Sequence, residues 1–405
     1  MKILSVNKFF WNKGGSETVF FNEKALLEKD GHTVIPFSMK SDENFDSPYS
    51  RYFVEYIDYS SPSLLAKIKN ASKIIYSFDA KDKMRELLKV DSPDVAHFHI
   101  FQHQISPSVF NPLRQHGVPI LLTLHDLKPM CPNYTMYTKA QVCEKCKGGK
   151  FYNAILNKCT KNSGFGSTIN ALEMYFHKAM GYYQQVDKFI AVSRFYLEKM
   201  VEFGFPREKL VYLPNAVNAD KFTKARSVSD YALYFGRLSE EKGVQTFIEA
   251  ASHNPSVNHK IVGTGPSLEL LENFIKNNKV KNVEILGFKS GEDLKKLIRE
   301  ALVVVVPSVW FENCPMTILE SFASSRPVIG ADIGGITELI NHEYDGFLFK
   351  PNDALQLSNY ISYFHDNPDS ANLFGERGRS KVKEEFNEKV HLEKLLEVYT
   401  SLKRS

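Results

Sequence analysis

Short apolar runs alternate with amphipathic stretches along the first half of the chain. In the stretches Ser16 to Lys29 and Ala171 to Gln185, apolar residues recur at helical spacing. The apolar runs have the length and the Val, Ile and Phe content of buried strands: Lys2 to Val6, Thr33 to Phe37, Val95 to His99, Ile120 to His125 and Lys188 to Ser193. This alternation predicts a parallel, doubly wound α/β sheet.

The same rhythm restarts after a break near Phe222 to Asp230. The strands predicted there are Ala232 to Phe235, His259 to Val262, Val283 to Leu286, Leu302 to Pro307, Pro327 to Gly330 and Gly346 to Phe349. Ligands of such sheets bind beyond the carboxyl ends of the strands. The pattern therefore predicts two Rossmann-like domains facing each other across a cleft.

These patterns divide the chain into three predicted parts. Residues 1–222 form an N-terminal Rossmann-like domain with a cysteine-rich insertion at about 131–161, and residues 223–386 form a C-terminal Rossmann-like domain. Residues 387–405 alternate apolar and charged positions at helical spacing, which predicts a closing helix that packs back across the N-terminal domain.

Composition adds limits on partners and location. The chain is 43% hydrophobic and 24% charged, as in ordinary globular proteins, and its net charge of +4 does not predict nucleic-acid binding. The first residues, MKILSVNKFFWNKGG, are too short an apolar stretch for a signal peptide, and no run approaches the roughly 20 apolar residues of a membrane helix. We expect a cytoplasmic protein, and the charge is compatible with peripheral contact at the inner face of a membrane.

A loop after the strand Leu302 to Val306 carries the first candidate site. Pro315 suits the first turn of a helix, Met316 to Ala323, whose N-terminus favours a phosphate or sugar hydroxyls. Glu312 precedes this helix and Glu320 lies about two turns into it, where a carboxylate can accept two hydrogen bonds from a ribose diol. Taken alone, this spacing describes two solvated glutamates equally well.

Neighbouring strand ends strengthen the donor-site interpretation. Arg237 follows one strand and Lys242 opens the next helix, so the two cations suit a diphosphate. Gly263 begins a Gly-Thr-Gly-Pro loop after another strand, and Gly334 and Gly335 precede a helix. One glycine pair is weak evidence, but such loops at successive strand ends indicate a shared binding edge.

The strings GRLSEEKG, IVGTGP and PSVWFENCPMTILESFASSRPVIGADIGGITELI resemble, in this order, the donor domain of glycosyltransferase family 4, retaining enzymes of the GT-B fold. The resemblance implies that Arg237 and Lys242 bind the donor diphosphate, that Glu320 binds the ribose, and that Glu312 contacts the transferred sugar. It also implies sugar contacts from the backbone after Glu312, at Asn313, Cys314, Met316 and Thr317, and a donor contact at Gly263. Many members have Gly-Phe-Gly where this chain has Asn313-Cys314-Pro315, and Pro315 lacks an N–H group.

The first half supplies the opposite wall of the expected cleft. Gly14 and Gly15 permit a close backbone approach to donor phosphate or acceptor, and Ser16 is a reasonable N-cap. The family's similar Gly-Gly loop and strand-end histidine make Gly14, Gly15 and His125 candidate site residues. His125 follows a strand and could donate a hydrogen bond to a sugar hydroxyl or phosphate. Ser193 resembles a cleft position of the family with little specificity.

Other histidines raise the question of a metal. The spacing of His97 and His99 in a strand puts both on one face, with His103 nearby, and a role in the core or in lining the cleft is favoured over zinc.

The cysteine spacing points to a separate metal site. Four of the five cysteines, namely Cys131, Cys143, Cys146 and Cys159, follow a C-x11-C-x2-C-x12-C pattern rich in nearby lysines. In a reducing compartment this pattern predicts a structural zinc, with unmetallated thiols or an iron–sulfur cluster as alternatives.

The predicted function is retaining transfer of a hexosyl group from a UDP-sugar or GDP-mannose to a glycan or lipid-linked glycan in surface polysaccharide synthesis. The resemblance implies that Glu312, His125, Arg237 and Lys242 are catalytic and that catalysis needs no cofactor. A nucleotide-sugar epimerase of the same fold, a sugar phosphorylase and a non-catalytic nucleotide-sugar binding protein are the alternatives.

Overall fold

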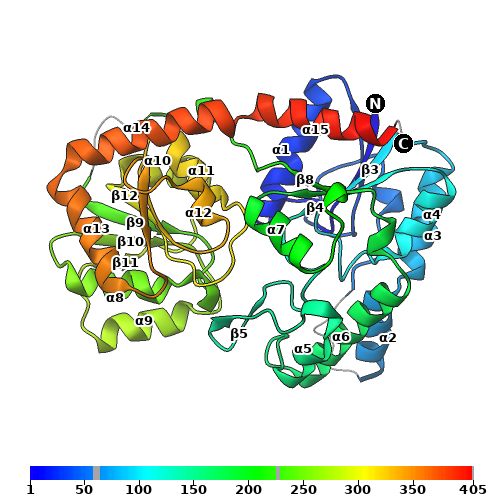
Figure 1. Cartoon of the computed structure of the whole chain (residues 1–405), viewed down its shortest axis with the longest axis horizontal. Helices are drawn as coiled ribbons and strands as arrows, with labels where there is room; N and C mark the ends of the chain where they lie inside the picture. Colours follow the sequence, from blue (N-terminus) through cyan, green and yellow to red (C-terminus); the bar gives the residue numbers. More distant parts are fainter. Residues whose placement is uncertain (58–63, 225–228, 404–405) are drawn as a thin grey trace. The chain divides into compact units, whose positions relative to one another are not determined.

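The computed structural model describes residues 1–57, 64–224 and 229–403, so residues 225–228 of the expected break lie outside the described residues. The chain forms two compact units (Figure 1). Unit 1 comprises Met1–Met136, Cys143–Leu213 and Leu392–Ser405, and unit 2 comprises Tyr137–Val142 and Pro214–His391. The division therefore falls after Leu213, before the expected boundary at residue 222.

The described residues of unit 1 include six strands in one parallel sheet, in the order β2-β1-β3-β4-β7-β8. The strands are β1 (Lys2–Val6), β2 (Thr33–Phe37), β3 (Val95–Phe98), β4 (Ile120–Leu124), β7 (Lys188–Ala191) and β8 (Leu210–Tyr212). The prediction of a doubly wound sheet is confirmed. The sequence missed β8, because three residues are too few to show a periodicity.

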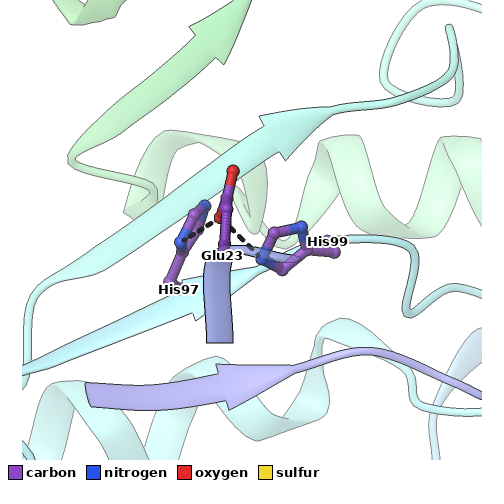
Figure 2. A group of neighbouring side chains, drawn as sticks. All are labelled: Glu23, His97 and His99. Atoms are coloured by element: carbon purple, nitrogen blue, oxygen red, sulfur yellow. Dashed lines mark ion pairs between the residues drawn. The ribbon is translucent and has the colours of Figure 1, made fainter. Parts of the chain in front are cut away.

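The helices of unit 1 are α1 (Gly15–Lys29), α2 (Leu64–Ile75), α3 (Phe78–Leu88), α4 (Phe110–Gln115), α5 (Tyr152–Leu156), α6 (Gly164–Ala179), α7 (Arg194–Glu202) and the greater part of α15 (Glu388–Lys403). The predicted helix Ala171 to Gln185 was misplaced. Ser163 caps α6 at its start by accepting a hydrogen bond from the N–H of Gly166, and α6 ends at Ala179. Helix α1 places Glu23 beside His97 of β3 and beside His99, which directly follows β3 (Figure 2).

Unit 2 has a second parallel sheet, in which six strands of the described residues follow the order β11-β10-β9-β12-β13-β14. The strands are β9 (Tyr231–Phe235), β10 (Asn258–Val262), β11 (Val283–Ile285), β12 (Val303–Val306), β13 (Val328–Ala331) and β14 (Gly346–Phe349). The chain runs outward from β9 and returns to β12 beside it. The carboxyl ends of these two strands therefore flank the topological switch point, where doubly wound sheets bind ligands.

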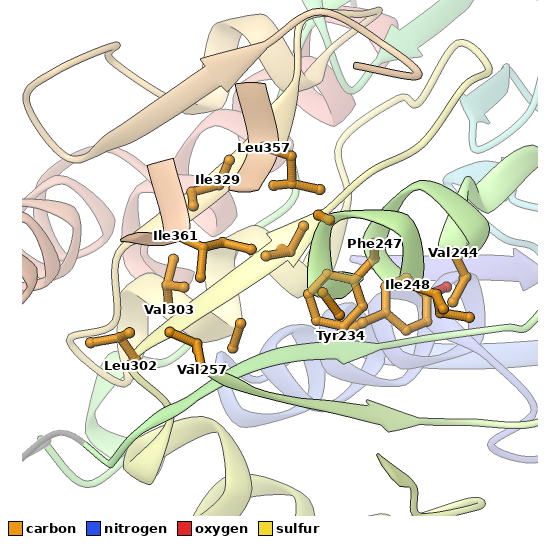
Figure 3. Close-up of a cluster of buried hydrophobic side chains, with 14 of the residues drawn as sticks. Tyr234, Val244, Phe247, Ile248, Val257, Leu302, Val303, Ile329, Leu357 and Ile361 are labelled. Atoms are coloured by element: carbon orange, nitrogen blue, oxygen red, sulfur yellow. The ribbon is translucent and has the colours of Figure 1, made fainter. Parts of the chain in front are cut away.

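The helices that follow these strands are α8 (Val244–His253), α9 (Leu268–Asn277), α10 (Gly291–Glu300), α11 (Met316–Ala323), α12 (Ile336–Leu339), α13 (Ala354–Asp366) and α14 (Pro368–Glu385). Phe247 and Ile248 of α8 and Ile361 of α13 pack with Val303 and Ile329 of the sheet into one buried cluster (Figure 3). This packing holds β12 rigidly at the switch point.

The cysteine-rich insertion has little regular structure. It contains a short antiparallel hairpin of β5 (Tyr137–Thr138) and β6 (Gln141–Val142), followed by α5. None of the helices in the described ranges combines the length and the apolar character that a bilayer-spanning segment requires.

Candidate functional site

Two strand-end loops meet at the switch point of unit 2. Strand β9 continues into Gly236 and Arg237, and β12 continues into the loop 307–315. The side chain of Arg237 is exposed, and its carbonyl oxygen accepts a hydrogen bond of 2.8 Å from the hydroxyl of Tyr234. The hydrogen bond fixes the backbone of Arg237 at the carboxyl end of β9, and the exposed guanidinium is accessible to a ligand.

Glycines let these loops pack closely. Gly243 has a left-handed φ of 64°, and Gly263 has a φ of 141°. A Cβ atom on Gly243 would overlap the carbonyl oxygen of Pro307, and one on Gly263 would overlap that of Gly236. Both residues thus bring neighbouring strand ends together, and a direct donor contact of Gly263 stays a prediction.

Glu312 lies at the centre of this edge. Its side chain is buried, and Oε1 accepts hydrogen bonds from Lys242 Nζ at 2.7 Å and from Ser308 Oγ at 2.6 Å. Burial alone would raise the pKa of Glu312, but the Lys242 ammonium and the Ser308 hydroxyl outweigh it and hold the pKa below its usual range. Glu312 is therefore an ionised, buried carboxylate, and the description of it as a solvated glutamate is wrong.

The backbone after Glu312 is anchored through its carbonyl groups. The N–H of Gly335 donates to the carbonyl oxygen of Glu312 at 2.8 Å, and Asn215 Nδ2 donates to that of Cys314 at 2.9 Å. The side chains of Asn313 and Cys314 are buried. The Gly334-Gly335 loop therefore supports the position of Glu312.

Helix α11 spans Met316–Ala323, as the sequence predicted. Pro315 lies at the N-cap in an extended conformation, directly before the helix and not in its first turn. Met316 and Thr317 are the first helical residues, so their N–H groups have no acceptor within the helix. These two groups can bind a phosphate or sugar oxygen, and the helix dipole favours a negative charge there.

The second predicted carboxylate, Glu320, differs from Glu312 in its electrostatics. Its side chain is half-buried on α11, and burial raises its pKa to about 7, with a smaller opposing effect from Lys295. Without a ligand, Glu320 is therefore about half protonated at neutral pH.

Lys242 connects these groups to a prospective diphosphate. Its ammonium lies 5.0 Å from the centre of the Trp310 ring and contacts Glu312 at 2.7 Å. An ammonium has three donors, so Lys242 can hold Glu312 and still donate to a phosphate oxygen.

In unit 1, helix α1 begins at Gly15, with Gly14 at the N-cap and no capping side chain. The expectation of Ser16 as N-cap is wrong, because Ser16 lies inside the helix and its hydroxyl donates to the Glu17 carboxylate at 3.1 Å. Gly14 and Gly15 are exposed, whereas Glu17 is buried beside them. An anion at this helix end would meet the charge of Glu17, so the site suits hydroxyl groups better than phosphate.

His125 lies just beyond the end of β4 and is half-buried. Its Nε2 is 2.9 Å from His99 Nδ1, and the two ring planes are 20° apart with their centres separated by 5.2 Å. Burial lowers the pKa of His125 to about 4, although the Glu23 carboxylate partly opposes this effect. His125 is therefore a neutral imidazole near pH 7.

Glu23, His97 and His99 form a buried polar cluster (Figure 2), and His99 contacts His125. Glu23 Oε2 lies 3.7 Å from His97 Nδ1 and 3.5 Å from His99 Nε2. His97 and His99 thus share one face, as predicted, and the spacing of the three groups could suit a metal ion. However, the His97 ring already contacts Tyr399 Oη at 2.8 Å through Nδ1 and Thr123 Oγ1 at 2.7 Å through Nε2. These contacts describe a hydrogen-bond network that supports the core role.

His103 belongs to a different group. Its Nε2 lies 3.1 Å from Lys128 Nζ and 3.4 Å from Glu173 Oε2. Lys128 and Glu173 form an almost fully buried ion pair of 2.6 Å. Burial would raise the pKa of Glu173, but Lys128 and His103 lower it to about 2. Of its members, Lys128 lies three residues after His125 in the chain.

The four predicted zinc ligands, Cys131, Cys143, Cys146 and Cys159, are gathered in unit 1, half-buried and without a disulfide. Burial, together with the nearness of the other three thiols, raises the pKa of Cys146 to about 12. Among the described residues, Glu23, His97 and His99 are the group of three whose ligand atoms all lie within 4.8 Å of one another, so no three of the four sulfur atoms lie that close together.

Several residues of these sites were not found from the sequence. Ser308 and Trp310 were treated only as loop residues, and Tyr399 only as part of a closing helix. Glu23 could have been found, because it occupies a position on the buried face of α1 between Phe20 and Leu27. A charged residue on an apolar helix face signals a buried partner. Ser193, by contrast, caps α7 by accepting a hydrogen bond from the N–H of Tyr196.

Comparison with known proteins assigns the chain to a family. The family described as Glycosyltransferase Family 4 matches residues 13–221, and the one described as Glycosyl transferases group 1 matches residues 218–381. The putative colanic acid biosynthesis glycosyltransferase WcaL of Escherichia coli K12 is 28% identical over 243 residues, covering 56% of this chain and 60% of that protein. The UDP-Gal:alpha-D-GlcNAc-diphosphoundecaprenol alpha-1,3-galactosyltransferase of Escherichia coli is 27% identical over 237 residues, covering 53% and 58%.

The chain thus matches less than two thirds of the length of either relative. Among solved structures, sucrose-phosphate synthase from Thermosynechococcus elongatus has a TM-score of 0.74 at 18% identity, covering 99% of this chain and 98% of that one, which is a likeness of the GT-B fold. Because the family 4 match extends over more than half of the sequence, the chain belongs to glycosyltransferase family 4.

Proposed function

We propose that this protein is a retaining glycosyltransferase that moves a hexosyl group from a nucleotide sugar to a glycan or lipid-linked glycan in surface polysaccharide synthesis. One observation carries the proposal. The ionised carboxylate of Glu312 is held by Lys242 at the switch point of unit 2, beside the N-terminus of α11. Burying a charged carboxylate at a ligand-binding edge, with a partly exposed lysine as its partner, costs stability, which favours a functional role.

The proposed donor pose follows from the charges at this edge. Arg237, Lys242 and the first N–H groups of α11 bind the diphosphate, and Glu320 accepts hydrogen bonds from the ribose diol. Glu312 contacts the transferred sugar. The relative that acts on UDP-Gal and a diphosphoundecaprenol-linked acceptor supports a UDP-sugar as donor and a lipid-linked glycan as acceptor. GDP-mannose is the alternative donor.

The proposed reaction is a front-side displacement. The acceptor oxygen forms a bond to the anomeric carbon on the face from which the diphosphate departs, so the configuration is retained. The bond from that carbon to the diphosphate oxygen breaks, and this oxygen takes the proton of the acceptor hydroxyl. Arg237 and Lys242 stabilise the charge that develops on the leaving group.

A ligand panel tests the donor site. UDP-glucose, UDP-galactose, UDP-N-acetylglucosamine and GDP-mannose are each added to the purified protein, and the melting temperature is measured. A donor present at about 100 times its Kd is expected to stabilise the fold by about 2.7 kcal/mol. If no nucleotide sugar shifts the melting temperature, the donor-site assignment fails.

The same panel separates the alternatives. Incubating the stabilising nucleotide sugar without an acceptor is expected to leave it unchanged, apart from slow hydrolysis. Conversion to a different nucleotide sugar would identify an epimerase. Stabilisation without transfer to any lipid-linked glycan of an extracted acceptor pool would favour a binding protein over a transferase.

We also propose a structural zinc bound by Cys131, Cys143, Cys146 and Cys159. Backbone N–H groups of Asn133 and Met136 donate to the Cys131 sulfur, and that of Ala154 donates to the Cys146 sulfur. Such bonds stabilise thiolate ligands. The insertion between the cysteines has little regular structure, and a bound metal would cross-link and stabilise it.

Elemental analysis checks the zinc proposal. The purified protein is expected to contain close to one equivalent of zinc, and Cys143→Ser is expected to lose it, because a thiolate ligand is removed. Cys314→Ser serves as the matched control, since Cys314 is a buried cysteine of unit 2 and is not one of the four proposed ligands. Less than about half an equivalent after careful preparation would point to unmetallated thiols.

A further inference from the structure

His125, which the family resemblance makes a candidate for contact with the substrate, is the last member of a chain of three side chains. His125 Nε2 lies 2.9 Å from His99 Nδ1. His99 Nε2 in turn lies 3.5 Å from Glu23 Oε2, a pair that Figure 2 shows. His125 follows β4, His99 follows β3 and Glu23 lies on α1, all within unit 1. Glu23 and His99 are buried, whereas His125 is half-buried.

The proton positions along this chain follow from the charge at its inner end. An imidazole nitrogen that faces a carboxylate carries its proton there, because a lone pair would be repelled. His99 therefore has Nε2 protonated and, as a neutral ring, offers a lone pair at Nδ1. At 2.9 Å one proton lies between the two rings, so it belongs to His125 Nε2.

We infer that Glu23, acting through His99, holds His125 in the tautomer protonated at Nε2, so that Nδ1 is the nitrogen available to the substrate as a hydrogen-bond acceptor. The inference deepens the proposed function and rests on it for the role of His125. It also reverses the sequence-based expectation that His125 donates to the sugar. His125 would accept a hydrogen bond from a sugar hydroxyl, and Glu23 is a positioning residue.

The neighbouring contacts of the cluster are compatible with this arrangement. Other groups that contact it include His97 of β3, Thr123 of β4, Tyr399 of α15 and the Phe20 ring of α1. By the same rule, His97 carries its proton at Nδ1, which lies 3.7 Å from Glu23 Oε2, and donates it to Tyr399 Oη, while His97 Nε2 accepts a hydrogen bond from the Thr123 hydroxyl. His97 is thereby held neutral without drawing on the proton between His99 and His125.

NMR tests the tautomer independently of activity. The full chain is labelled with 15N-histidine, and long-range proton–nitrogen spectra of the histidine rings are recorded. In the wild type, His125 is expected to show a protonated Nε2 and an unprotonated Nδ1. In Glu23→Leu this preference is expected to be lost and a mixture of tautomers to appear. Retention of the wild-type tautomer in Glu23→Leu would overturn the inference.

Two further variants guard against a folding artefact. Glu23→Gln keeps the size of the side chain and is measured if the leucine variant does not fold, with a weakened tautomer preference expected because the charge is gone. Tyr399→Phe removes a hydroxyl from the same buried cluster and is expected to leave the His125 tautomer unchanged. If Tyr399→Phe changes the tautomer as much as the Glu23 variants do, the effect is one of packing and the inference fails.

Kinetic measurements test whether the His125 tautomer affects the rate of sugar transfer. Glu23→Gln is expected to lower kcat about tenfold, the worth of one hydrogen bond, with little change in the KM for the donor. An unchanged kcat would contradict the positioning role. If the wild type itself transfers no sugar, the proposed function fails, while the NMR result still decides the tautomer.

Discussion

Replacing Glu312 with glutamine is expected to lower the rate of sugar transfer by on the order of 100-fold, the typical cost of losing one preorganised electrostatic group. Glutamine has the same shape and can still accept hydrogen bonds from Ser308 and Lys242, so unit 2 is expected to stay folded. What disappears is the negative charge that holds Lys242 in place. The measurements are kcat with the identified donor and the melting temperature.

Removing the other partner of the pair has a different consequence. Lys242→Met is expected to reduce transfer as strongly, but it also leaves the buried Glu312 carboxylate without its cation, which costs about 3 kcal/mol of stability. The sequence alone predicts that either change would spare the fold, because it does not reveal that Glu312 is buried. The double variant Glu312→Gln, Lys242→Met is expected to recover most of the lost stability without recovering activity.

Lys276→Met provides the matched control, because Lys276 is an exposed lysine on α9 of the same unit. It is expected to leave transfer and stability unchanged. Near-normal turnover in either single variant of the pair would remove Glu312 and Lys242 from the site.

The strands could be predicted because each is an apolar run bounded by polar or glycine-containing turns. β12 is four consecutive buried valines, and β1 and β14 begin and end where the sequence places them. Element ends were less predictable where capping decides them. Ser163 starts α6 earlier than its apolar periodicity indicates, and Gly15 starts α1 before Ser16.

The candidate site likewise has features that could be predicted from the sequence and features that depend on folding. The residue types and their order were readable, because strand-end loops with Gly, Arg, Lys and Glu are local patterns. The pairing of Lys242 with Glu312 spans two strands that lie side by side only after folding. The link from Glu23 to His125 requires α1, β3 and β4 to pack together, so no local pattern contains it. Burial, which sets the charge of each carboxylate, is likewise a property of the packed unit.

Donor affinity is expected to fall as the pH drops below about 7, because burial raises the pKa of Glu320 to about that value in the ligand-free protein. In the proposed pose the ribose diol donates two hydrogen bonds to the ionised carboxylate, so binding below pH 7 must first release a proton. The Kd should therefore rise by close to tenfold for each pH unit below the pKa, and by about 100-fold at pH 5. Isothermal titration calorimetry from pH 5 to 8 measures this dependence.

Glu320→Gln separates this group from every other titrating residue. The variant is expected to bind the donor more weakly at pH 8, with a Kd that changes little between pH 5 and pH 8. A raised pKa also means that ionisation of Glu320 destabilises the ligand-free fold, so its contribution to stability is present below about 4.5 and is lost as the pH rises through about 7. Glu320→Gln should therefore melt at a higher temperature than the wild type at pH 8. A pH dependence of binding that survives in this variant would place the titrating group elsewhere, and an unchanged affinity at pH 8 would remove Glu320 from the ribose site.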